Sequence, residues 1–506
     1  MRASRPEAGS GFWWAALVGL CLVLVAPLWV CEVPPLIDYP NHLARLFVLA
    51  LLPGDTELAK FYAAHWSVIP NLALDIAGPP LMHVLPVYAV GRLLIAASVL
   101  LPVLGTAAYG TASGNRWWPL GAGLAGWNNC LLYGFLNFSI GIGLALLLAA
   151  AWLRWREAYP IRAVVLAAAG APVLFACHLM GVVFFAALIG GAELFRVYRS
   201  SRKLTEAVRR GSVLALIFAV PGLLYAMSDL RQLGGDAMFL PPGEKLFQLA
   251  GVFTNYIRPL DIATAVVAIG LPVMGVAMRW GRVPGPAGVA MFGLCFGFLA
   301  APYAWKGTYH LDTRLAVMLD FMQFAGFVPG RWPRGVRLGV AAAVLVLFAA
   351  RMTVLTAAFA ARQADVADIR TVLAPVQPGQ AVYVAAAANP GGRALSDGFR
   401  TDIHLGALAL IERRAWWPFE FDNVSQQPLE TREPYRSMAE RVGDLPDEAR
   451  TATADVCGFD YVLLTGADAA PGLPPERFHL LARSGFAALY GITRCRAPAD
   501  RPGSSG

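Results

Sequence analysis

Apolar runs of about 20 residues recur through most of this 506-residue chain, and most of them end at an arginine. A helix of that length spans the hydrocarbon core of a bilayer, and basic residues beside it set its orientation. Only 15 % of the residues are charged, whereas soluble domains carry about a quarter. The chain is therefore predicted to be a polytopic α-helical membrane protein. Its net charge of +8 reflects arginines in short loops and does not indicate a nucleic-acid partner.

The sequence predicts about eleven transmembrane helices. They lie near 12–31, 93–112, 118–133, 138–153, 163–177, 179–195, 211–228, 262–278, 286–304, 314–330 and 338–356. The first run is too long for a signal-peptide core and lacks a small-x-small cleavage site, so we expect an uncleaved anchor.

Loop charges predict the orientation of these spans. With the N-terminus inside, the inner loops hold 17 basic residues against three acids, and the outer loops hold eight against ten. This asymmetry follows the positive-inside rule and places everything after Arg362 outside. The 37 arginines against four lysines, with abundant alanine and glycine, suggest a GC-rich bacterium. We expect a multi-pass protein of the bacterial inner membrane with a cytoplasmic N-terminus and a periplasmic tail.

The tail has ordinary charge density, and its apolar runs are too short to span a membrane. Residues 380–385, 459–464 and 486–493 are predicted strands, and 402–414 is a predicted amphipathic helix. The predicted domains are a membrane domain at 1–359, with a long first outer loop at 32–92, and an extracytoplasmic α/β domain at 360–496. Residues 497–506 are predicted to be disordered. Cys457 and Cys495 flank predicted strands, so they either form a disulfide in an oxidising compartment or are unrelated.

The candidate functional residues are polar groups expected on the outer face. Asp38, His42 and Arg45 follow the first span directly, within the stretch 34–45. The inner loops contain no histidine. An uneven distribution of titratable groups between the two faces is expected of an active site on one of them. The other candidates are Tyr133, Asn137, His178, Tyr256, Arg258, Lys306, His310, Arg314 and Asp320.

Each candidate also has a purely structural interpretation. Asp38 suits a helix start, because Pro40 favours the first helical turn and an acid there complements the helix dipole. His42 and Arg45 are three residues apart and fit a solvated helix face. Asp320 is expected inside a span, where an acid needs a partner or a water-filled cavity; Arg351 is its expected partner.

The chain resembles the GT-C superfamily of membrane glycosyltransferases, which use polyprenyl-phosphate sugar donors. The resemblance consists of a first span with its N-terminus inside, a first outer loop with Asp38-x-x-x-His42, many further spans and an outer soluble tail. The resemblance implies that Asp38 is the catalytic carboxylate. It implies that 43–52 and 56–66 form two helices along the membrane surface, and that His310 and Arg314 meet the donor phosphate. This loop carries one acid where many members have two adjacent ones, so dependence on a divalent metal stays open and no cofactor is assigned.

The chemistry of an inverting transfer fits these residues. Such a reaction needs one carboxylate as base and cations for the leaving phosphate. We assign catalysis to Asp38 and His42, and phosphate binding to Arg45, Lys306, His310 and Arg314. A weaker substrate pocket is assigned to Tyr133, Asn137, His178, Tyr256, Arg258 and Asp320. The expected partners are membrane lipid, a polyprenyl-phosphate sugar and a glycan, lipid or protein acceptor.

Three other functions stay open at this point. A non-catalytic scaffold for cell-envelope assembly would use the same spans and tail. A lipid or polysaccharide transporter would need a polar path, but the middle and inner halves of the spans are largely apolar. An O-antigen-ligase-like transferase would carry its site in a large late outer loop, whereas the largest loop here is the first.

Overall fold

The computed structural model describes residues 10–493 and divides the chain into two compact units. Unit 1 comprises Met1–Val30, Ser67–Ile76 and Arg92–Ala358, and unit 2 comprises Cys31–Trp66, Ala77–Gly91 and Phe359–Gly506. The terminal stretch 497–506 and Cys495, one end of the predicted disulfide, lie outside the described residues.

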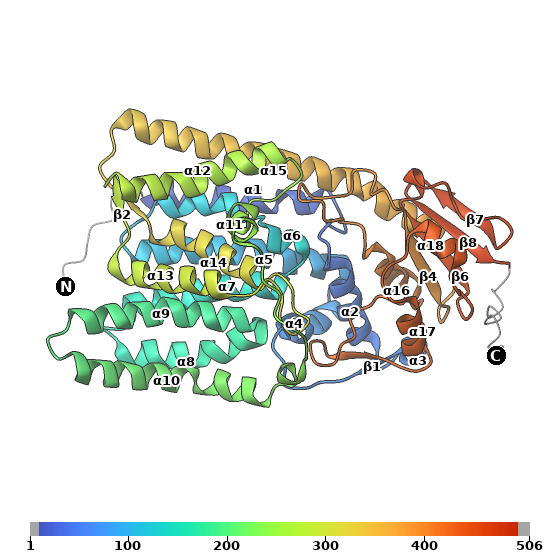
Figure 1. The fold of residues 1–506 in the computed structure, drawn as a ribbon, viewed down its shortest axis with the longest axis horizontal. Helices are drawn as coiled ribbons and strands as arrows, with labels where there is room; N and C mark the ends of the chain where they lie inside the picture. Colours follow the sequence, from blue (N-terminus) through green and yellow to red (C-terminus); the bar gives the residue numbers. More distant parts are fainter. Residues whose placement is uncertain (1–9, 494–506) are drawn as a thin grey trace, which may run out of the picture. The chain divides into compact units, whose positions relative to one another are not determined.

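Eight helices among the described residues are long and apolar enough to cross a membrane, which confirms a polytopic helical chain. They correspond to eight of the predicted spans (Figure 1). They are α1 (Ser10–Val25, continued by η1, Ala26–Trp29), α5 (Val87–Ala112), α7 (Leu136–Trp155), α8 (Pro160–Cys177), α9 (Leu179–Arg199), α10 (Lys203–Met227), α12 (Arg258–Ala277) and α15 (Arg334–Val372).

The other three predicted spans differ from a regular transmembrane helix. Two are shorter helices of 16 residues, α13 (Gly285–Ala300) and α14 (Leu311–Gly326). The third, 118–133, is not one helix but a 3-10 helix, η2 (Trp118–Ala125), followed by the short α6 (Asn129–Tyr133).

Close packing explains the broken segment at 118–133. A Cβ atom on Gly121, Gly123 or Gly126 would lie 2.6–2.8 Å from a side-chain carbon of Phe324, Leu20 or Leu24, respectively. Glycine therefore lets this backbone approach its neighbours, but it also weakens an α-helix. The mean hydropathy of a segment does not show that its glycines weaken the helix, so 118–133 is predicted as one span.

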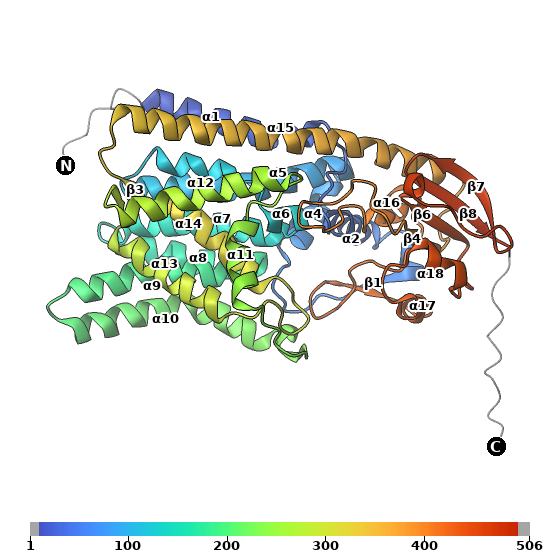
Figure 2. The ribbon, with the colours of Figure 1, turned by 45° about the horizontal axis from the view of Figure 1, so that its top comes forward.

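The helices of unit 1 pack side by side, with α9 against α7 and α13, and α8 against α7 and α10 (Figures 1 and 2). α5 and α7 approach closely at Gly105 and Gly143, where a Cβ on Gly105 would lie 2.6 Å from the carbonyl oxygen of Gly143. Small residues at such crossings are typical of membrane helices. The remaining elements of this unit are η3 (Asp229–Gln232), α11 (Pro242–Gly251), β2 (Gly281–Arg282) and β3 (Val328–Pro329).

The first outer loop contributes a helix and a strand to unit 2. α2 (Tyr39–Leu51) covers the first of the two predicted surface helices. The prediction for 56–66 is wrong, because α3 (Leu58–Phe61) makes only one turn before β1 (Tyr62–Ala64). β1 pairs antiparallel with β5 (Leu429–Thr431) of the tail. Residues 62–64 are therefore a strand because they pair with a strand that is distant in the sequence. α4 (Ala73–Met82) follows.

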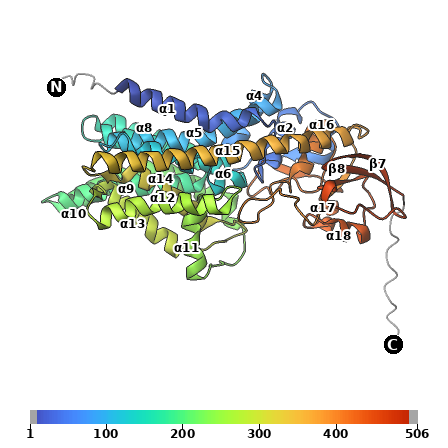
Figure 3. The same ribbon diagram turned by 90° about the horizontal axis from the view of Figure 1, so that it is seen from above.

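A four-stranded sheet forms the core of the tail. Its order is β4 (Val382–Ala386), β6 (Tyr461–Thr465), β8 (Ala487–Ile492) and β7 (Phe478–Ser484). β4 and β6 are parallel, and the other pairs are antiparallel. The three predicted strands are confirmed. In the view of Figure 3, α17 (Tyr435–Val442) and α18 (Glu448–Thr453) lie beneath β7 and β8.

The predicted helix at 402–414 is confirmed in its second half. Residues Leu405–Ala407 form a 3-10 turn, η4, and α16 (Leu408–Arg413) continues it. A second 3-10 turn, η5 (Ala467–Ala469), follows β6.

The end of α15 is fixed to this sheet by buried polar contacts. Arg393 donates to both carboxylate oxygens of Asp365, each at 2.9 Å, and to Asp468 at 2.9 Å. Three residues after Asp365, Asp368 accepts from Ser484 Oγ at 2.6 Å. The last turns of α15 thus belong to the packed interior of unit 2.

Candidate functional site

Asp38 lies at the N-cap of α2, but its side chain does not cap the helix. Its Oδ1 instead lies 3.3 Å from Nδ1 of His404, which comes from the tail. Both residues belong to unit 2. The carboxylate therefore does not play the capping role that Pro40 and the helix dipole would suggest for it.

The tautomer of His404 follows from its backbone contact. Nδ1 lies 3.0 Å from the carbonyl oxygen of Ile37, and a carbonyl can only accept a hydrogen bond. The neutral ring therefore carries its proton on Nδ1, which leaves a lone pair on Nε2. The edges of Trp417 and Phe421 meet the ring at centroid distances of 6.4 and 5.2 Å. The imidazole is thus held in one orientation.

His42 and Arg45, both on α2, contact each other. Nη1 of Arg45 lies 3.1 Å from Nδ1 of His42, and the ring of His42 meets Phe421 edge-on at 5.5 Å. Arg45 has no exposed surface, so these residues are not a solvated helix face. Beside them, Asn41 Nδ2 donates to the carbonyl of Phe419 at 2.9 Å. These contacts join the first outer loop to the segment 417–421.

Glu420 is a site residue that is not among the candidates predicted from the sequence. Its side chain is only 7 % exposed, and Oε1 accepts from the Phe421 N–H at 3.1 Å. Oε2 makes no hydrogen bond of normal geometry among residues 10–493, although the indole N–H of Trp417 lies close enough to favour the charged carboxylate. Burial raises the pKa of this carboxyl to about 8, against the opposing charge of Arg45. The sequence does carry one sign of this burial. Glu420 lies within the aromatic run 416–421, and a run of aromatic residues is rarely found on the surface of a soluble domain.

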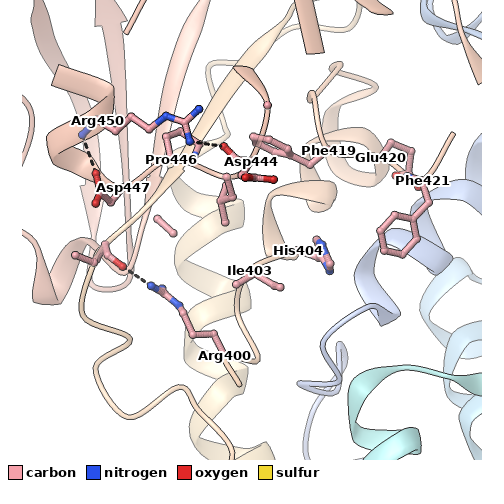
Figure 4. A pocket seen from close by; sticks show the side chains of 15 residues that line it. Arg400, Ile403, His404, Phe419, Glu420, Phe421, Asp444, Pro446, Asp447 and Arg450 are labelled. Carbon is pink, nitrogen blue, oxygen red and sulfur yellow. Dashed lines mark hydrogen bonds between the residues drawn. The ribbon is translucent and has the colours of Figure 1, made fainter. Parts of the chain in front are cut away.

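A cavity of about 690 Å³ opens beside these groups, as Figure 4 shows. It lies at the carboxyl end of β4, next to the parallel strand β6, where α/β sheets commonly bind ligands. Asp38 is not part of its wall. The wall is formed by Ala386, Ala387, Ala388, Arg400, Ile403, His404, Phe419, Glu420, Phe421, Gly443, Asp444, Leu445, Pro446, Asp447 and Arg450.

Three of the predicted residues meet in unit 1. His310 adopts a left-handed backbone conformation (φ 61°), and its ring lies 4.9 Å from that of Tyr133. One turn later, Arg314 lies over the ring of Phe135 at 4.4 Å and donates to the carbonyl of Tyr309 at 2.8 Å. The structure therefore brings Tyr133, His310 and Arg314 together.

Other predicted residues in unit 1 have mainly structural contacts. Asn137 holds the segment 71–74 by bonding the backbone of Asn71 and Leu74 at 2.7 and 3.1 Å. His178 accepts from the Met180 N–H at 3.0 Å and so caps α9. Lys306 donates to the carbonyl of Arg231 at 3.0 Å.

Two further predicted pocket residues lie at the start of α12. Tyr256 is half-buried just before the helix, and Arg258 is its exposed first residue.

The predicted ion pair of Asp320 with Arg351 is wrong. Arg351 pairs with Asp261, Nη1 to Oδ1 at 3.0 Å, and also donates to the carbonyl of Phe253. Asp320 accepts from the side-chain amide of Gln323, one turn along the same helix. Arg351 therefore pairs with Asp261, and the buried carboxylate of Asp320 is hydrogen-bonded by the amide of Gln323 in its own helix.

No group of three histidine, cysteine or acidic residues within 10–493 is placed to hold a metal ion. Neither the protein-family models nor the curated proteins that we compared with the sequence give a match. The geometry of the two units therefore carries the functional argument.

Proposed function

We propose that the protein is a membrane glycosyltransferase that moves a sugar from a polyprenyl-phosphate donor to an acceptor hydroxyl. The Asp38–His404 pair supplies the general base. The observation that carries this proposal is that the Asp38 carboxylate leaves its helix cap and faces an imidazole on the wall of a cavity. A carboxylate that orients a histidine is a common way to build a base active near neutral pH.

The eight apolar helices support a lipid-linked donor, because a polyprenyl chain requires an apolar environment. An inverting transfer also needs cations for the leaving phosphate. We assign that role to Lys306, His310 and Arg314 of unit 1. Arg45 is engaged with His42 and is assigned to the support of α2.

The proposal includes the orientation derived from the loop charges. The transfer takes place on the outer face of a bacterial inner membrane, and the acceptor belongs to the cell envelope. A non-catalytic scaffold of the envelope is the competing function.

An Asp38→Asn variant tests the proposal. The full-length protein in nanodiscs is incubated with radiolabelled polyprenyl-phosphate hexose and pentose, and with an envelope extract as acceptor. Each reaction is run with and without a chelator. We expect Asp38→Asn to transfer label at least about 100-fold more slowly than the wild type, because general-base catalysis contributes that much.

The matched control is Glu476→Gln, which neutralises an exposed acid of the tail that does not line the cavity. It should transfer label at the wild-type rate. Equal thermal unfolding of the two variants excludes misfolding as the cause. Near-normal transfer by Asp38→Asn would overturn the assignment of Asp38, and absence of transfer by the wild type with every donor would favour the scaffold.

A further inference from the structure

The wall of the tail cavity presents one ring nitrogen. His404 lines the cavity, whereas Asp38 does not. Nδ1 of His404 is committed to the Ile37 carbonyl and the Asp38 carboxylate. Nε2 is therefore the atom of the Asp38–His404 pair that can accept a proton from a molecule in the cavity.

The cations of the cavity are already neutralised or saturated. The guanidinium of Arg400 donates to both oxygens of Asp402, at 2.9 and 2.7 Å, and to the carbonyl of Ala387. Arg450 donates to the carbonyl of Asp444 at 3.2 Å (Figure 4) and to the carbonyl of Val442 at 2.7 Å. An anionic ligand would find few free donors here.

The acids of the cavity point to the same conclusion. Asp444 and Asp447 line the wall, so a phosphate or carboxylate would meet like charges. Asp447 already accepts from the Arg450 N–H at 2.7 Å as a helix cap. The cavity is therefore suited to an uncharged ligand.

Glu420 shows what kind of uncharged ligand fits. A polar atom that is buried without a hydrogen bond is costly, and Glu420, a residue of the cavity wall, holds its Oε2 in that state. Because Oε2 itself has almost no accessible surface, the Glu420 side chain has to turn toward the cavity for a ligand to reach this oxygen. A hydroxyl group can donate to a carboxylate or accept from a carboxylic acid, so it suits this oxygen in either protonation state. Phe419 and Phe421 add apolar surface, as in most small-molecule sites.

We propose that this cavity is the acceptor site and that the acceptor is an uncharged, polyhydroxylated compound, a carbohydrate. His404 Nε2 takes the proton of the reacting hydroxyl, and Glu420 hydrogen-bonds a neighbouring hydroxyl. Asp38 is a positioning residue that fixes the imidazole. The catalytic part rests on the proposed glycosyl transfer, whereas the binding part is independent of it.

The transfer conserves every atom and electron pair. The acceptor O–H bond breaks, and its proton goes to Nε2 of His404. The freed electron pair of that oxygen forms the new bond to the anomeric carbon of the donor. The bond from that carbon to the phosphate oxygen breaks, and its electrons leave with the polyprenyl phosphate. The imidazolium then releases its proton to water.

Binding is tested without turnover. Full-length protein in nanodiscs, free of sugar-based detergent, is titrated with neutral trisaccharides of glucose, galactose and mannose, and with glucose 6-phosphate. Binding is followed by the fluorescence of the tryptophans, which include Trp417 beside His404. We expect saturable binding of at least one neutral saccharide, weakened at least tenfold in Glu420→Ala and restored largely in Glu420→Gln.

The control variant Glu476→Ala should bind like the wild type. Binding of the phosphorylated sugar alone, or no saturable binding of any neutral saccharide, overturns the acceptor site. Equal affinity in Glu420→Ala and the wild type overturns the role of Glu420.

The base is tested by a second pair of variants in the transfer assay. We expect His404→Gln to lower kcat about 10,000-fold with saccharide binding kept, and Asp38→Asn to lower it less, by about 100-fold. His479→Gln, at an exposed histidine of β7, is the matched control. If Asp38→Asn is inactive while His404→Gln is active, Asp38 is itself the base and the inference fails, but the proposed function stands. If both variants keep wild-type transfer, the inference fails together with the catalytic assignment of the Asp38–His404 pair.

Discussion

At the scale of single residues, Glu420 should make the stability of the protein depend on pH. Its pKa of about 8 in the folded protein exceeds the ordinary value of 4.5 that it regains on unfolding. Between these two values the folded protein keeps a proton that the unfolded chain has lost. The free energy of unfolding therefore falls as pH rises, by at most about 1.4 kcal/mol per pH unit.

This pH dependence is measured by thermal unfolding at pH 5, 6, 7 and 8. We expect Tm of the wild type to fall over this range more steeply than Tm of Glu420→Gln, which has no proton to lose. Parallel curves for the two proteins would show that the carboxyl is ionised in the fold.

Arg393 should be the most costly single residue to remove from the tail. It is 5 % exposed, binds Asp365 and Asp468, and lies over the ring of Phe486 at 4.4 Å. Arg393→Ala leaves the buried Asp365 with one cation instead of two, because only Arg362 remains beside it, with Nη1 3.1 Å from Oδ2. Breaking a buried ion pair typically costs about 3–5 kcal/mol, and the remaining arginine should keep the cost near the lower end of that range. We expect a marked fall in Tm and faster proteolysis of the tail. Arg441→Ala, at an exposed arginine of α17, should change the free energy of unfolding by less than about 0.5 kcal/mol.

Part of the candidate site could be predicted from sequence at this scale. Asp38 is conspicuous because it follows an apolar span directly. Its partner is not, because His404 lies 367 residues beyond the Ile37 carbonyl that it contacts, and only the tertiary fold brings them together. Glu420 resembles an ordinary acid until its burial is known. The pairing of Arg351 with Asp261, rather than with Asp320, likewise depends on distances that no spacing encodes.

At the scale of elements, length and hydropathy predict most long helices, because a membrane span has to satisfy both. They fail at 118–133, where glycines weaken the helix but let the backbone pack closely against neighbouring side chains. β7 has a strand-like backbone, but its sequence Phe-His-Leu-Leu-Ala-Arg-Ser lacks strict alternation. Residues 62–64 become a strand only because β5 is available to pair with them.

The crossing of α5 and α7 should depend on Gly143. A Cβ on this residue would overlap the backbone of Leu101, and backbone cannot rotate away as a side chain can. Gly143→Val should therefore cost at least about 1–3 kcal/mol by overpacking. Gly190→Val in α9 is the matched control, because a Cβ there meets no atom within 4 Å. A lower Tm and a poorer size-exclusion profile are expected for the first variant alone; equal behaviour of both would refute the close crossing.

At the scale of the whole molecule, the loop charges predict that the tail and the α9–α10 loop lie on opposite sides of the membrane. In a cysteine-free background, Glu476→Cys and Ser201→Cys place one exposed thiol in each region. A membrane-impermeant maleimide should label Glu476→Cys in intact spheroplasts and Ser201→Cys only after permeabilisation. The reverse pattern would invert the orientation, and equal labelling of both before permeabilisation would contradict the topology.

The assembly of unit 2 from distant segments has a consequence for biosynthesis. Arg432 Nε donates to the carbonyl of Tyr62, which the ribosome makes 370 residues earlier. At about 5–20 residues per second, β1 waits roughly 20–70 s for its partner strand. During that time the nascent chain carries an open strand edge of the kind that chaperones and proteases recognise. A premature stop before β5 would thus leave a permanent degradation signal near the N-terminus.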